Sequence, residues 1–207
     1  MFKKSFTNGN FFCIILVMEL ILASKSPRRK QILEELGVQF KIIPALKDEV
    51  VDYSLSKSKI VESIALCKAQ EVFEKFPDCA VIGSDTIVVL DDEILQKPKD
   101  SADAEAMLKK LSGKTHSVLT GYVVLTPTER ISGAECSLVT FNELSQKTID
   151  DYVESGLCMD KAGAYGVQDG FGLVKCVEGS YYNVVGFPRE RFETILIELG
   201  FIKRGKN

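Results

Sequence analysis

The segment from Ala80 to Leu90 most constrains how this chain can fold. It is an apolar run rich in β-branched residues, which is typical of a buried strand, but Gly83-Ser84-Asp85 interrupts it. A carboxylate is costly to bury unless it is paired, hydrogen-bonded or bound to a metal. We therefore expect Asp85 to point into a polar cleft. The alternative is that neighbouring backbone groups satisfy Asp85 at a strand bulge.

The rest of the chain predicts a compact α/β domain, since 207 residues are more than one average domain and fewer than two. A hairpin turn is expected at Asp91-Asp92. The glycine-dense residues 160–187 show no long periodic segment, which favours tight turns or backbone approaching a ligand. Patterning predicts strands near 14–23, 38–42, 80–90, 116–126 and 131–141, and helices near 27–36, 57–76, 104–111, 146–155 and 188–199.

The first 17 residues are set apart from this domain. A basic start, a short apolar stretch and the small residue Ala23 would suit a secretory signal peptide. However, Glu19 interrupts the stretch, which is also too short to span a bilayer. Cleavage after Ala23 would in addition remove the first predicted strand. We expect residues 1–17 to be an extension upstream of a natural start at Met18, and residues 18–207 to form a single domain.

Composition and missing motifs exclude several classes of function. A net charge of −3 and a pI near 5.4 argue against bulk binding of nucleic acid or a membrane surface, so any phosphate binding must be local. The six cysteines form no CxxC pair, which predicts no zinc site, reduced thiols and a cytoplasmic compartment. The chain has no Walker loop and no GxSxG elbow, so P-loop ATPase, kinase and serine-hydrolase functions are not expected.

A cationic turn separates the first predicted strand from the first predicted helix. Four of the six residues from Lys25 to Lys30 are basic. Unpaired backbone N–H groups at the helix start and the hydroxyls of Ser24 and Ser26 suit a polyphosphate, as do the forked donors of Arg28 and Arg29. The alternative is a solvated first helical turn that Ser26 caps.

Other residues are candidates for the same chemistry. Glu49, in an acidic loop, can join Asp85 as an oxygen ligand for Mg²⁺ or Mn²⁺. Lys97, which precedes a proline, can contact phosphate in a transition state. Gln168 lies in the glycine-dense segment, where its amide can read a base edge. Each can instead be an ordinary solvated residue, and His116, the only histidine, is expected to be a structural hydrogen-bonding group rather than a general base.

Six motifs follow one another along the chain: LASKSPRR at 22–29, GSDTIV at 83–88, KP at 97–98, SGKTHSVLTG at 112–121, DKAGAYGVQ at 160–168 and GSYYNVVGFP at 179–188. Together they resemble the Maf family of nucleoside triphosphate pyrophosphatases over Met18 to Gly200. The resemblance implies a mixed, strongly twisted α/β fold with two lobes around a deep cleft, similar to inosine triphosphate pyrophosphatases, and commonly a homodimer. It implies hydrolysis of a nucleoside triphosphate between its α and β phosphates, with a divalent metal.

The resemblance also implies residue roles. Asp85 resembles the proton acceptor that readies water, and Glu49 matches the acidic position used with the metal. The residues that resemble the phosphate-handling set are Ser24, Arg28, Arg29 and Lys97. The residues that match the specificity positions, and resemble the branch acting on dTTP and UTP, are Arg28, Thr86 and Gln168. Two positions depart from the family pattern: Phe187 replaces the usual Leu, and Asp169 replaces a frequent Gly.

Three hypotheses for the function of this chain are compared. The first is a hydrolase that removes surplus or modified pyrimidine triphosphates. The second is a nucleotide-binding regulator of cell division or septum formation with little hydrolysis, and the third is a nucleic-acid-binding module that uses the cationic turn. Asp85, Glu49 and Lys97 favour the hydrolase, because phosphoanhydride cleavage needs charge clamps, a metal and an oriented water. We expect a nucleoside triphosphate as partner, with neither nucleic acid nor membrane.

Overall fold

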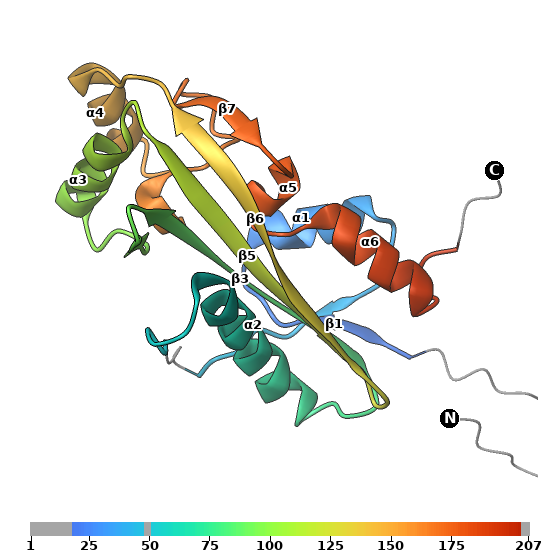
Figure 1. Cartoon of the computed structure of the whole chain (residues 1–207). Coiled ribbons are helices and arrows are strands. Elements are labelled where there is room, and N and C mark those ends of the chain that lie inside the picture. The colour runs from blue at the N-terminus through green and yellow to red at the C-terminus, as the bar shows by residue number, and fades with distance from the viewer. Residues whose placement is uncertain (1–17, 48–50, 204–207) are drawn as a thin grey trace, which may run out of the picture.

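The computed structural model describes residues 18–47 and 51–203, which form a twisted mixed sheet with helices on both of its faces (Figure 1). The expected N-terminal extension and Glu49 lie outside the described residues. The elements are β1 (Leu20–Leu22), α1 (Pro27–Glu35), β2 (Lys41–Ile42), α2 (Lys57–Phe73), β3 (Ala80–Leu90), β4 (Glu93–Leu95), α3 (Ser101–Leu111), β5 (Thr115–Leu125), β6 (Arg130–Phe141), α4 (Gln146–Glu154), the short 3₁₀ helix η1 (Ala162–Ala164), β7 (Val174–Glu178), α5 (Tyr181–Val185) and α6 (Arg189–Glu198).

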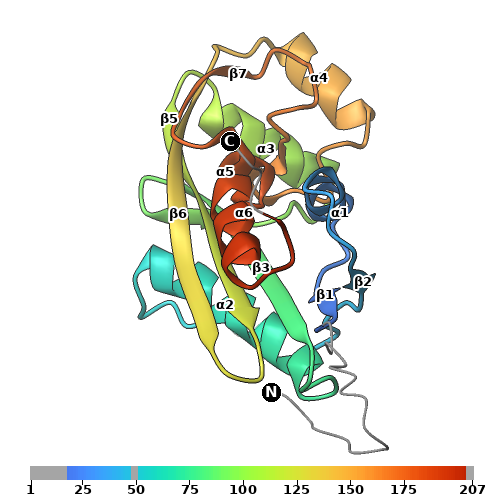
Figure 2. The same cartoon turned by 90° about the vertical axis from the view of Figure 1, so that its right-hand side faces the viewer.

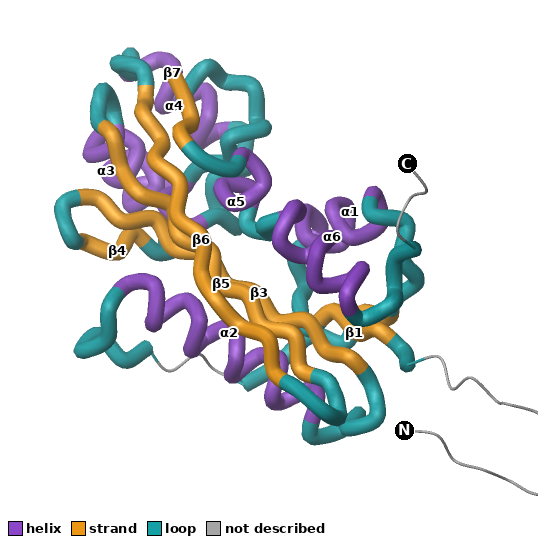
Figure 3. The backbone as a smooth tube through the Cα atoms, turned by 45° about the vertical axis from the view of Figure 1, so that its right-hand side comes forward, coloured by secondary structure: helices purple, strands orange, loops and turns teal. Residues whose placement is uncertain are grey.

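The sheet has seven strands in the described part of the chain, in the order β2-β1-β3-β5-β6-β7, with β4 also paired to β3. β1 is parallel to both β2 and β3, whereas the remaining pairs are antiparallel. The long strands β3, β5 and β6 form its spine (Figure 3). Strand and helix order therefore follow the expected mixed α/β architecture.

One edge of β3 is left open at its middle. On one side, β5 pairs with β3 without a break from Val81 to Val89. On the other side, β1 pairs with residues 80–82 and β4 pairs with residues 88–90, so residues 83–87 have no strand partner there. Gly83-Ser84-Asp85 therefore interrupts the apolar pattern of the sequence but not the predicted strand. The strand is continuous, and the gap lies in the ladder beside it.

Two glycines allow α2 to lie directly on the sheet. A Cβ atom on Gly83 of β3 would collide with the backbone oxygen of Ala65 on α2. A Cβ atom on Gly121 of β5 would likewise collide with the backbone of Val61. Because neither glycine has a side chain, the helix backbone approaches β3 and β5 more closely than side-chain packing would otherwise allow.

The hydrophobic core is divided between the two ends of the sheet. At one end, α3 and α4 pack with β5, β6 and β7, around buried residues such as Leu108, Phe141 and Tyr152 (Figure 1). At the other end, α1 and α6 cover one face of β1, β3 and β5, while α2 covers the opposite face (Figure 2). These two ends correspond to the two expected lobes, and the long strands join them.

Most predicted elements are confirmed, and the exceptions are short. Ser26 caps α1 and Pro27 begins it, as expected. Asp91 and Asp92 both adopt positive φ, which confirms the hairpin turn between β3 and β4. Of the strand expected at 14–23, residues 14–17 lie outside the described residues and β1 covers 20–22. The strand expected at 38–42 is reduced to β2, and the glycine-dense segment contains the unpredicted β7 and α5. Both are only five residues long, which is too short for a clear periodic signal.

His116 is a structural residue of the α3–α4 end. Its side chain is buried, and Nε2 lies 2.7 Å from the Tyr165 hydroxyl oxygen. Its ring also meets the rings of Phe141 and Tyr165 edge-on. Burial lowers the pKa of His116 from 6.5 to about 4, so the imidazole stays neutral in the folded chain at neutral pH.

This burial predicts a pH-dependent stability. Between pH 6.5 and about 4 the unfolded chain binds a proton that the folded chain does not, so the free energy of unfolding falls as the pH falls. His116 should account for about 3 kcal/mol of this loss. A His116→Gln variant should show a flatter pH profile in the same window, as measured by urea unfolding. Parallel profiles for the two proteins would contradict the assignment.

Candidate functional site

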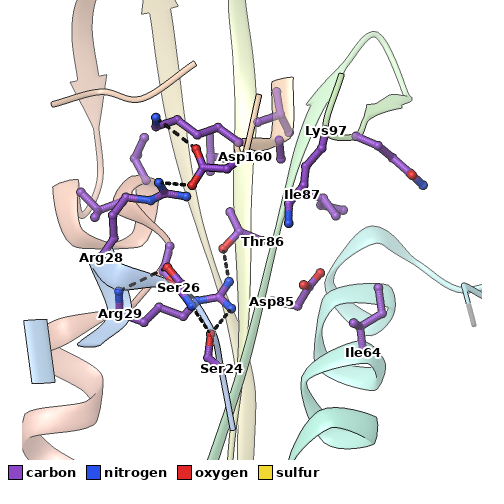
Figure 4. Close-up of a pocket in the computed structure, with 18 of the residues that line it drawn as sticks. Ser24, Ser26, Arg28, Arg29, Ile64, Asp85, Thr86, Ile87, Lys97 and Asp160 are labelled. Carbon is purple, nitrogen blue, oxygen red and sulfur yellow. Dashed lines mark hydrogen bonds and ion pairs between the residues drawn. The ribbon is translucent and has the colours of Figure 1, made fainter. Parts of the chain in front are cut away.

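A pocket of about 800 Å³ lies at the open edge of β3 (Figure 4). Its walls come from the end of β1, the start of α1, the middle of β3, one side of α2 and the glycine-dense segment. Every described residue that the sequence predicts for the site lines this pocket: Ser24, Arg28, Arg29, Asp85, Thr86, Lys97 and Gln168. In particular, Asp85 and Arg28 share one cavity.

The pocket is strongly cationic in a chain that is acidic as a whole. Of the described residues that line it, seven are basic and two are acidic, whereas the whole chain carries a net charge of −3. Such a concentration of one sign of charge in a concave site attracts an anionic ligand. The basic residues are Lys25, Arg28, Arg29, Lys47, Lys68, Lys97 and Lys161, and the acidic residues are Asp85 and Asp160.

The start of α1 is built to receive an anion. Ser26 Oγ accepts a hydrogen bond from the Arg29 N–H at 3.4 Å and caps the helix. Ser24 Oγ accepts a hydrogen bond from the Ser26 N–H at 3.2 Å. These two N–H groups are therefore engaged, and Pro27 has none, so the first turn offers an anion in the pocket the Arg28 N–H and the positive end of the helix dipole.

Arg29 connects three segments of the pocket wall. Its Nε donates to the Gly186 carbonyl at 2.9 Å, and its two terminal nitrogens donate to Ser24 Oγ at 3.3 Å and Thr86 Oγ1 at 3.4 Å. Thr86 Oγ1 also lies 3.0 Å from Thr120 Oγ1 on β5. Arg29 therefore holds the β1–α1 turn against β3 and the end of α5 (Figure 4).

Asp85 forms a close ion pair that the sequence did not reveal. Its Oδ1 accepts a hydrogen bond from Lys68 Nζ of α2 at 2.6 Å. Only 13% of the Asp85 side chain and 19% of the Lys68 side chain are exposed. The β3–β5 register is regular at Asp85, which faces Gly121, so the bulge alternative is wrong and the partner is a charged side chain. The available signal was a lysine on the apolar face of the predicted helix, four residues after Ile64.

Asp85 and Thr86 lie on opposite faces of β3, since neighbouring residues of a strand alternate between its faces. Asp85 faces α2, whereas Thr86 faces Arg29 and Thr120 (Figure 4). The pocket reaches both residues because it surrounds the open edge of the strand. A ligand bound there can thus contact groups on both faces of the sheet.

Arg28 is also held by a partner that the sequence did not reveal. Its Nη1 donates to Asp160 Oδ2 at 2.9 Å, across 132 positions of the chain. Burial opposes ionisation of Asp160, but the hydrogen bond and charge of Arg28, with the charge of Lys161, lower its pKa overall. This contact joins the start of α1 to the glycine-dense segment.

Lys97 and Gln168 are exposed residues of the pocket lining. Within the described part of the chain, the side chain of neither residue forms a hydrogen bond or an ion pair. Both side chains therefore remain available to a ligand. Glu49 is not described, although Lys47 and Val51 on either side of it line the pocket, so its role stays a prediction.

Comparison with known proteins decides the family. Residues 19–199 match the family model described as Maf-like protein. The chain belongs to the Maf-like family. A dTTP/UTP pyrophosphatase of Symbiobacterium thermophilum is 44% identical over 186 residues, which cover 89% of this chain and 96% of that protein. A dTTP/UTP pyrophosphatase of Aquifex aeolicus is 46% identical over 190 residues, which cover 89% of this chain and 97% of that protein.

A solved structure supports the fold of this Maf-like protein. A HAM1 protein from Coxiella burnetii aligns with a TM-score of 0.50 at 14% identity. The alignment covers 88% of this chain and 100% of the Coxiella burnetii chain. At this identity the likeness concerns the fold alone, and it agrees with the expected mixed α/β architecture.

The charge of the pocket predicts binding of inorganic tripolyphosphate. Arg28→Ala should weaken this binding about tenfold, because the variant loses a forked, charge-assisted donor. Isothermal titration calorimetry measures the effect, and Lys147→Ala, on the exposed side of α4, is the matched control. Equal affinities of the wild type and Arg28→Ala would show that Arg28 does not contact the bound anion.

Proposed function

We propose that this Maf-like protein is a pyrophosphatase that hydrolyses dTTP and UTP, and modified pyrimidine triphosphates, to the monophosphate and pyrophosphate. One observation carries the proposal: a cationic pocket encloses a lysine-paired carboxylate at the open edge of β3. The relatives named dTTP/UTP pyrophosphatase, 44% and 46% identical to this chain, support the same substrates. No observation favours the alternative of a binding regulator of septum formation.

In this proposal the cationic side of the pocket binds the triphosphate. The backbone N–H of Arg28 in the first turn of α1, the Ser24 hydroxyl and the guanidinium of Arg28 contact phosphate oxygens. Arg29 keeps Ser24 and Thr86 in place and adds its positive charge. Lys97 neutralises charge that develops on the leaving pyrophosphate. Such clamps supply most of what phosphoanhydride cleavage requires of a protein.

Asp85 is the proposed proton acceptor for the attacking water. Water adds to the α phosphorus, the bond from this phosphorus to the oxygen that bridges it to the β phosphate breaks, and pyrophosphate leaves. Asp85 takes the proton of the water as the new bond forms. The ion pair with Lys68 holds the carboxylate in one orientation.

A divalent metal belongs to the same proposal. The described residues include no group of three or more His, Cys, Asp or Glu side chains arranged for a metal. Mg²⁺ nevertheless suits the pocket, because it commonly uses one or two carboxylates together with phosphate and water oxygens. Asp85, with Glu49, would hold Mg²⁺ or Mn²⁺, which would neutralise phosphate charge and polarise the reacting phosphate.

Three residues of the lining are proposed to select the base and its attached sugar phosphate: Arg28, Thr86 and Gln168. The amide of Gln168 can donate to a pyrimidine carbonyl and accept from the adjacent N–H. A base with the wrong pattern would leave these groups unpaired, which costs affinity. The exposed position of Gln168 at the pocket wall supports this role.

We further propose that the protein acts in the cytoplasm as a homodimer of a single domain spanning residues 18–207. The five cysteines in the described residues are free, which supports a reducing compartment. The resemblance to the Maf family supports the dimer. None of the helices in the described ranges is long and apolar enough to cross a membrane.

Asp85→Asn tests the reaction itself. The wild type should release pyrophosphate from dTTP and UTP with Mg²⁺, and the variant should lose at least about 10²-fold in kcat, because the general base is removed. A coupled assay of pyrophosphate release measures both, with Asp151→Asn on the exposed side of α4 as control. A wild type that binds nucleotide but turns it over no faster than Asp85→Asn would support the regulator instead.

Gln168→Glu tests base selection. The carboxylate cannot donate to a base carbonyl, so KM for dTTP and UTP should rise about tenfold. The free energy of unfolding should change by less than about 0.5 kcal/mol, because the side chain is exposed. Steady-state kinetics over a panel of triphosphates, with urea unfolding, measure the two effects. An unchanged panel would show that Gln168 does not read the base.

A further inference from the structure

The segment that carries Gln168 is a tight turn at the pocket wall. The Asp169 N–H donates to the Gly166 carbonyl at 3.1 Å, so Val167 and Gln168 occupy the two central positions of the turn. Both central residues line the pocket. Since no hydrogen bond from the Gln168 side chain to another described residue holds it, its position depends on the backbone of this turn.

One buried hydroxyl holds both ends of the turn. Tyr152 lies on α4 with its ring fully buried and packed edge-on to Phe171. Its hydroxyl accepts a hydrogen bond from the Gly166 N–H at 3.0 Å and donates one to Asp169 Oδ2 at 2.5 Å. Burial, followed by the neighbouring Asp169 carboxylate, raises the pKa of Tyr152, so the phenol keeps the proton that it donates.

Lys161 supplies the positive charge that Asp169 needs. The side chains of Lys161 and Asp169 are 8% and 9% exposed, and Lys161 Nζ lies 3.2 Å from Asp169 Oδ2. Nζ also donates to the Leu157 carbonyl and lies 3.3 Å from Asp160 Oδ1. Because Asp160 holds Arg28, one continuous chain of contacts connects the Gln168 turn to the start of α1.

From this arrangement we propose that Asp169 is a positioning residue for base selection, acting with Tyr152 and Lys161. Asp169 holds the turn through its contacts with the Tyr152 hydroxyl and Lys161. The turn then sets where the Gln168 amide lies in the pocket. This inference rests on the proposed function and extends it to residues that do not themselves contact the base. Uracil and cytosine present opposite patterns of donors and acceptors at the same edge, so discrimination between them depends on where the amide is held.

The test compares UTP with CTP as substrates of the full chain. In Asp169→Ala, KM for UTP should rise about tenfold and the preference for UTP over CTP should fall about tenfold, because the misplaced amide no longer discriminates. The change in kcat for UTP should stay within about threefold, because the substitution removes neither Asp85 nor any side chain that contacts phosphate. Asp151→Ala, an exposed carboxylate next to Tyr152 in sequence, is the matched control.

Two further variants separate positioning from folding. Tyr152→Phe removes the shared hydroxyl and should lower the UTP preference in the same way, and combining it with Asp169→Ala should add little. Asp169→Asn retains an acceptor for the Tyr152 hydroxyl but loses the charge that pairs with Lys161, so it should give an intermediate preference. If Asp169→Ala does not fold, as judged by circular dichroism, the UTP preferences of Tyr152→Phe and Asp169→Asn decide whether Asp169 acts as a positioning residue.

Folded variants that keep the wild-type KM and UTP preference overturn the inference, as does a loss in kcat that is equal for both nucleotides. Failure of the proposed function is a different result, in which the wild type hydrolyses UTP no faster than Asp85→Asn. Calorimetric binding of UTP and CTP would then decide the inference on the same criterion, the loss of discrimination in Asp169→Ala.

Discussion

The unpaired stretch of β3 between Gly83 and Ile87 is the constraint on which the site depends. β1 and β4 both pair with the same edge of β3 but at different ends, so the strand is open only at its middle. β5 supports the other edge throughout and keeps the open stretch extended. An extended strand presents successive side chains to opposite faces, so Asp85 and Thr86 lie on different faces of the sheet. Both line one pocket because the pocket surrounds the open edge of the strand.

Charge is the second property that organises the molecule. An acidic chain collects basic side chains at this one pocket, and the two acidic residues of the described lining are each paired with a cation. A partly buried carboxylate without a partner would be costly. The pairs of Lys68 with Asp85 and of Arg28 with Asp160 therefore stabilise the charged groups and set their orientations.

Local signals explain which structural predictions succeeded. The Ser26 cap, the turn at Asp91-Asp92 and the apolar run of β3 each act through neighbouring residues, and each is confirmed. The weak elements β2, β7 and α5 depend on neighbours across the sheet, and their own sequences carry little periodic signal. The same distinction holds at the site. Ser24 and Arg28 were predicted from the turn they share, whereas Asp160, the partner of Arg28, was not.

From the sequence alone one can derive the order of the longer strands and helices, the acid within an apolar strand, the cationic turn and the resemblance to the Maf family. These follow from periodicity, capping and burial costs, which act over a few residues or on single groups. Only the tertiary structure decided that Lys68 pairs with Asp85, that Asp160 holds Arg28, and that Tyr152 and Asp169 support the Gln168 turn. These pairs join residues far apart in the sequence, so no local pattern predicts them; the Lys68–Asp85 pair, for example, depends on the close approach of α2 to β3 that Gly83 and Gly121 allow.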